Sequence, residues 1–81
     1  MTFELYTDAV LTRDVPAHGL RAGDVVKVID HHAGPEGEEG YSIEVFNAVG
    51  DTIAVTAVAE SFLEALMPDE VFSVRRLPLA A

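Results

Sequence analysis

The sequence contains no cysteine and no tryptophan, and only five of its 81 residues are lysine or arginine. Without cysteine, neither disulfide bonds nor a cysteine-ligated zinc ion can supplement a hydrophobic core. No apolar run approaches the roughly 20 residues that a transmembrane helix needs, and the first residues lack the basic and then apolar layout of a secretory signal. We therefore expect a cytoplasmic protein, since the absence of cysteine is typical of that reducing compartment.

The shortage of basic residues leaves the chain strongly acidic. Fourteen aspartates and glutamates give it a formal net charge of −9, which repels the phosphates of nucleic acids and the surface of anionic membranes. We expect neither nucleic acid nor membrane as a partner, and a basic protein is favoured instead. Hydrophobic residues make up 49% of the sequence, enough for residues 1–81 to form a single domain whose core depends on packing alone.

Five segments have the composition and pattern of short β-strands. In residues 41–46, apolar and polar residues alternate with the period of two that is typical of a strand with one solvent-exposed face. The other four strands are predicted from their β-branched and apolar residues at 5–12, 24–31, 52–58 and 70–77. Residues 60–66 follow a helical pattern that Pro68 limits in length, which predicts one short helical turn before the last strand.

Glycine and proline mark the connections between these segments. Gly19 and Gly23 bracket a corner that leads into the second strand, where a residue must adopt a positive φ or two backbones must approach closely. The residues that we expect to form structural turns are Pro16, Gly19, Gly23, Asp24 and Gly50. With a long glycine-rich loop at 32–40, this layout predicts an all-β fold, a small SH3-like five-stranded barrel with one short helical turn before its last strand.

Three stretches of the chain, at 10–25, 41–45 and 50–54, resemble a bacterial family of unknown function, domain family 4926. The most specific part is 11–24, where a Thr-basic-Asp-apolar-Pro run leads into a Gly-Leu-basic-x-Gly-Asp turn. The resemblance implies a small bacterial protein with an SH3-like barrel and no assigned catalytic residues. Members of the family are often encoded beside other short proteins, which implies a toxin-neutralising or immunity-type pairing.

The residues best suited to metal binding or catalysis lie around the loop at 32–40. His31 and His32 are weak candidates for metal ligands, because successive residues of a strand point to opposite faces of the sheet. Glu38 and Glu39 could be proposed for acid and base catalysis, but nothing apolar surrounds them to separate their pKa values. We therefore expect no metal, no cofactor and no enzymatic activity.

These observations favour a non-enzymatic protein-interaction module, and the family resemblance implies that it acts as an antitoxin, an immunity protein or a regulator of a neighbouring gene product. The residues expected to bind the partner are Glu36, Glu38, Glu39, Tyr6 and Phe46. The alternative is a metal-binding or small-molecule-binding accessory domain that uses His18, His31 and His32. Open strand edges further predict a monomer or a weak homodimer.

The two consecutive arginines near the end of the sequence, Arg75 and Arg76, form its only basic pair. They could bind carboxylates of a partner or pair with acidic residues of the chain itself. Of these two roles, the internal one is favoured.

Overall fold

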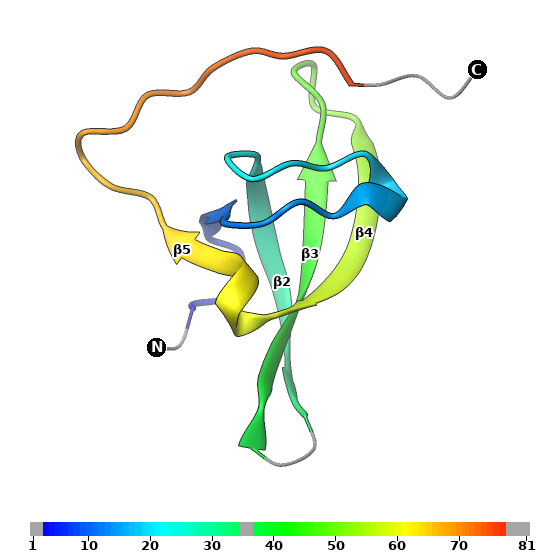
Figure 1. Ribbon diagram of the computed structural model, residues 1–81, viewed down its shortest axis with the longest axis vertical. Helices are drawn as coiled ribbons and strands as arrows, with labels where there is room; N and C mark the ends of the chain where they lie inside the picture. The colour runs from blue at the N-terminus through cyan, green and yellow to red at the C-terminus, as the bar shows by residue number, and fades with distance from the viewer. Residues whose placement is uncertain (1–2, 35–36, 78–81) are drawn as a thin grey trace.

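The computed structural model describes residues 3–34 and 37–77, and these residues form one antiparallel sheet with short 3-10 turns (Figure 1). The sheet order is β4-β3-β2-β1-β5. The elements in chain order are β1 (Asp8–Leu11), η1 (Pro16–His18), β2 (Val25–Ala33), β3 (Glu39–Phe46), β4 (Thr52–Ala59), η3 (Glu60–Phe62) and β5 (Leu63–Ala65). The prediction of an all-β fold with five strands is therefore confirmed for the described residues.

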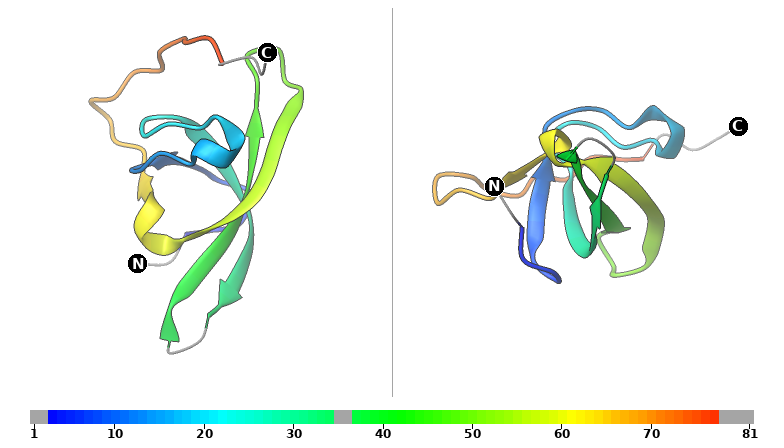
Figure 2. Two further views of the ribbon diagram at one scale, coloured as in Figure 1. Left: turned by 45° about the vertical axis from the view of Figure 1, so that its right-hand side comes forward. Right: turned by 90° about the horizontal axis from the view of Figure 1, so that it is seen from below.

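The sheet curls around an interior but does not close into a complete barrel (Figure 2). Irregularities in register between Val28 and Asp30, and between Val45 and Phe46, interrupt the ladders of the central strands. Such bulges bend a strand and increase its twist. Among the described residues β4 pairs only with β3, and β5 pairs only with β1. One edge of β4 therefore has no neighbouring strand.

The core lies inside the curl, and β3 contributes its centre. Tyr41, Ile43 and Val45 are at most 4% exposed, as the alternation in this segment predicts. The Tyr41 ring packs edge-on against Phe3, with 5.4 Å between ring centroids. Its hydroxyl accepts a hydrogen bond from the Phe3 amide at 3.1 Å and donates one to Glu60 Oε2 at 3.3 Å. The phenol at the centre of the core is thus both packed and hydrogen-bonded.

The prediction for the end of the chain is wrong in its boundaries. The helical turn covers only Glu60–Phe62, and the last strand is Leu63–Ala65 rather than 70–77. Leu63 pairs with Leu11, and Ala65 pairs with Ala9. Pairing with β1 therefore overrides the helical spacing of this segment, whereas 70–77 is an irregular segment without a strand partner among the described residues.

The first strand is also shorter than predicted, because the chain turns before it. Tyr6 has a φ of 65°, the one positive φ at a residue other than glycine in the described part of the chain. This left-handed conformation ends extended structure, so β1 begins at Asp8. None of the helices in the described ranges is long or apolar enough to cross a membrane.

Candidate functional site

The corner before β2 is fixed by hydrogen bonds that surround Asp24. The Asp24 carboxylate accepts the Arg21 amide at 2.8 Å, and the Asp24 amide donates to the Arg21 carbonyl at 3.0 Å. The Asp24 carbonyl accepts the amide of Leu11 at 2.9 Å, which ties the corner to β1. Gly19 and Gly23 adopt φ values of 69° and 96° on either side of the turn, a conformation that glycine reaches without a steric penalty.

Arg75 docks on this corner from the far end of the chain. Its Nε donates to Asp24 Oδ1 at 2.8 Å, and its Nη2 donates to Asp24 Oδ2 at 2.5 Å and to the Gly19 carbonyl at 3.1 Å. The side chains of Arg75 and Asp24 are 27% and 18% exposed. This two-pronged arrangement is the strongest form of arginine–carboxylate pairing, and it confirms the internal role expected for Arg75.

The electrostatics of the pair follow from this geometry. Burial favours the protonated form of the Asp24 carboxylate. The hydrogen bonds from Arg75 and from the Arg21 amide, together with both guanidinium charges, outweigh burial and hold the pKa of Asp24 below its ordinary value of 3.8. The same hydrogen bond raises the pKa of the Arg75 guanidinium. Both groups are therefore charged at neutral pH.

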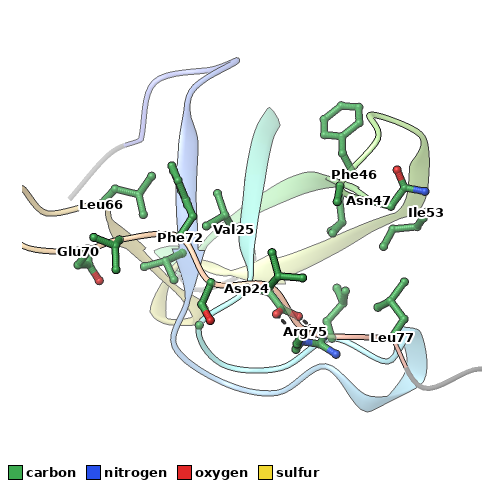
Figure 3. Close-up of a pocket in the computed structure, with 18 of the residues that line it drawn as sticks. Asp24, Val25, Phe46, Asn47, Ile53, Leu66, Glu70, Phe72, Arg75 and Leu77 are labelled. Atoms are coloured by element: carbon green, nitrogen blue, oxygen red, sulfur yellow. Dashed lines mark hydrogen bonds and ion pairs between the residues drawn. The ribbon is translucent and has the colours of Figure 1, made fainter.

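A groove lies beside this pair, between the sheet and residues 66–77, which we call the C-terminal strap. The groove has a volume of about 720 Å³. Figure 3 shows Arg75 directed at Asp24, with side chains of the sheet and of the strap bordering the groove. The apolar lining is contributed on the sheet side by Val10, Val25, Phe46 and Ile53, and on the strap side by Leu66, Phe72 and Leu77. We call this feature the strap groove.

The strap spans the groove without packing most of its own apolar side chains into it. Val71, Phe72 and Val74 are 91%, 76% and 90% exposed. Within the described ranges, the hydrogen bonds from the strap to the rest of the chain are those of the Arg75 side chain to Asp24 and Gly19. The remaining ones are local, such as those between Met67 and Glu70. Arg75 is thus the polar anchor of the strap.

The structure separates the residues that we expected to bind a partner. Phe46 is 40% exposed and lines the strap groove. Tyr6 is 71% exposed and belongs to the turn before β1, where its amide donates to the Val28 carbonyl. Glu38 and Glu39 lie at the β2–β3 hairpin, at the opposite end of the molecule from the strap (Figure 1). Glu36 lies outside the described residues.

The histidines do not share a site. His31 Nε2 contacts Glu39 Oε2, and its ring lies 5.0 Å from that of Tyr41. His32 Nε2 lies 2.6 Å from Ser42 Oγ, on the other face of β2 by strand alternation. His18 is exposed at the end of η1. The described residues contain no group of three His, Asp or Glu side chains that could hold a metal ion.

Sequence reasoning assigned Asp24 to a structural turn and missed its part in the groove. Asp24 and Arg75 are 51 residues apart, and nothing in the local pattern of either segment indicates the other. The available signal was the charge of the last residues, because 71–77 contain two arginines and no acid.

The chain was compared with protein families, with curated proteins and with solved structures. Residues 5–65 match the domain of unknown function DUF4926, so the match contains Asp24 and Phe46, and the whole strap follows it. No curated protein and no solved structure matches the chain. Since the matched segment covers well over half of the sequence, the chain belongs to the DUF4926 family.

Proposed function

We propose that this protein is a non-enzymatic, cytoplasmic interaction module of a bacterium, and that it binds a basic protein partner. The charge distribution carries the proposal. Residues 71–77 have a net charge of +2, from Arg75 and Arg76, so the rest of the chain, with 14 acidic and three basic residues, has a net charge of −11. This basic segment docks on the acidic remainder through Arg75.

A surface of this charge favours a cationic partner in two ways. Opposite charges accelerate the encounter of two proteins and exclude partners of the wrong sign. An inhibitor of a basic toxin gains association rate by this effect, and the resemblance to the family implies that the gene lies beside others that encode short proteins. The product of an adjacent gene is therefore the first partner to test, and an immunity-type or regulatory role is the form of the proposal that we favour.

The test is co-expression with the adjacent gene product, followed by calorimetry of the purified pair over a series of salt concentrations. We expect the association constant to fall steadily as salt rises, because the Debye length shrinks from about 10 Å at 0.1 M to about 3 Å at 1 M. An affinity that does not change with salt would count against a charge-driven interaction.

The contribution of the β2–β3 hairpin is tested with two double variants. Glu38→Gln with Glu39→Gln removes two charges from the hairpin, and Glu4→Gln with Glu64→Gln removes two exposed charges outside both the hairpin and the strap. If the hairpin contacts the partner, the first pair weakens binding more than the second. Equal effects would show that only the overall charge matters.

A further inference from the structure

We propose that the strap groove binds an extended, arginine-containing segment of the partner protein, and that the strap occupies the arginine position of this site while no partner is bound. The inference rests on the proposed function, since it names the chemistry by which a basic partner is recognised. The arginine of the partner segment pairs with Asp24, and the apolar side chains beside that arginine enter the strap groove.

The arginine position is built by the corner itself and not by the strap. Asp24 is oriented by the Arg21 amide at 2.8 Å, and the Gly19 carbonyl is fixed because the Gly19 amide donates to the Pro16 carbonyl at 3.1 Å. Three acceptor atoms therefore face one guanidinium, and the hydrogen bonds that orient them come from the corner itself. A planar fork of donors fits such a site, whereas the compact ammonium of lysine does not satisfy it equally.

The apolar part of the site is left incompletely filled by the strap. Phe46 and Ile53 are 40% and 38% exposed on the sheet side of the groove. On the strap side, Val71 and Val74 are almost fully exposed. A segment that places its arginine on Asp24 and directs apolar side chains into the groove would bury surface that the strap leaves in contact with water.

The strap itself is suited to displacement. It connects to the rest of the chain covalently at β5 and, among the described residues, through the polar contacts of one side chain, Arg75. Displacing it exchanges one guanidinium for another on Asp24, so the charged carboxylate is never left unpaired. The charge of −11 outside residues 71–77 favours a basic segment as the incoming group.

The probe for this site is a synthetic peptide with the sequence of residues 71–77, Val-Phe-Ser-Val-Arg-Arg-Leu, with blocked ends and a fluorescent label. Its binding to the full-length chain is measured by fluorescence anisotropy. In the wild-type protein Arg75 competes for the site, so binding is weak. We expect Arg75→Ala to bind the peptide at least about tenfold more tightly, the effect of freeing a site with charge-assisted hydrogen bonds.

Matched controls isolate the arginine position. Arg76→Ala removes the same charge but leaves the Asp24 contact intact, and we expect it to bind like the wild type. A peptide with lysine in place of both arginines keeps the charge and should bind Arg75→Ala at least about tenfold more weakly. If Arg75→Ala binds no better than Arg76→Ala, or if both peptides bind alike, the proposal is wrong.

The location is checked by the effect of the peptide on backbone amide resonances of Arg75→Ala. Shifts at Gly19, Asp24 and Val25 support the proposal, and shifts confined to the β2–β3 hairpin overturn it. This readout does not depend on the stability of an Asp24 variant. A wild-type dimer that dilution dissociates and Arg75→Ala abolishes would instead identify the strap of a second copy as the occupant, and would also overturn the proposal.

These outcomes are distinguishable from failure of the proposed function. The peptide experiments test the groove alone, while the salt dependence of the partner complex tests the charge-driven interaction. Salt-sensitive partner binding with no gain of peptide binding in Arg75→Ala would show that the groove is not the binding site. The proposal of a basic partner would still hold. A gain of peptide binding with a partner affinity that is independent of salt would support the groove as an arginine-binding site and refute the charge-driven interaction with the partner.

Discussion

Replacing Tyr41 by phenylalanine tests how the core is held together. The ring stays in place, but the hydroxyl that accepts the Phe3 amide at 3.1 Å and donates to Glu60 Oε2 at 3.3 Å is lost. A typical hydrogen bond contributes about 1 kcal/mol to stability, and the longer one less, so we expect unfolding to become easier by about 1.5 kcal/mol. In a domain of this size that loss lowers the melting temperature by roughly 6–12 °C.

The measurement is urea unfolding followed by far-ultraviolet circular dichroism, which does not depend on the replaced phenol. Tyr6→Phe is the matched control, because Tyr6 is 71% exposed and surface substitutions usually change stability by less than about 0.5 kcal/mol. Tyr41→Ala should cost about 3–5 kcal/mol, a large part of the roughly 4–12 kcal/mol expected for a domain of this size. Equal stability of Tyr41→Phe and Tyr6→Phe would show that the Tyr41 hydroxyl does not stabilise the core.

Three further predictions concern the corner, the β3–β4 hairpin and the open edge of the sheet. Because the pKa of Asp24 is lowered in the folded protein, its contribution is present above pH 3.8 and lost as the pH falls further. Asp24→Asn should therefore cost about 1 kcal/mol near pH 6 and progressively less as the pH falls below 3.8, and a difference that does not vary with pH would contradict this. Gly50 has a φ of 91°, and a Cβ added at this position would meet no other atom within 4 Å. Because the cost is then one of backbone conformation alone, Gly50→Ala should lower the stability of the fold by about 1–2 kcal/mol and Gly50→Asn by less. Thermal melts in which Gly50→Asn is the less stable variant would contradict this. Val55 is 55% exposed on edge strand β4. Val55→Lys places a charge on this edge and should reduce self-association, measured by light scattering, without lowering stability. Unchanged self-association would show that this edge does not mediate it.

The middle of the fold could be predicted because its pattern is local. In β3 the apolar side chains alternate and face the interior, so Tyr41 and Ile43 are buried as expected. The pairing of β3 with β4 follows from the short connection between these two strand-forming segments. These features require no knowledge of distant parts of the chain.

The end of the chain could not be predicted for the opposite reason. Residues 70–77 contain β-branched and aromatic residues and read as a strand, but a strand also needs a neighbour to receive its hydrogen bonds. In the structure β1 pairs instead with Leu63–Ala65, three residues whose spacing had indicated a helix. Pairing with β1 therefore outweighed the strand and helix propensities of these segments. Leu63–Ala65 follow the η3 turn directly and lie beside β1.

The candidate site was only partly predictable. Phe46 was expected to contact a partner and does border the strap groove, whereas Tyr6 lies elsewhere and the glutamates of the β2–β3 hairpin lie at the other end of the molecule. The contact between Asp24 and Arg75 joins residues 51 positions apart. Only the folded sheet brings the strap to the corner, so no local motif could reveal it.

The most direct test is the Nε–H resonance of Arg75 in the isotopically labelled protein, recorded free and saturated with its unlabelled partner. In the free protein this group donates to Asp24 Oδ1 at 2.8 Å. We predict that in the complex the resonance moves to the position of a solvent-exposed arginine, because an arginine of the partner then occupies Asp24. A resonance that stays unchanged at saturation would contradict the account.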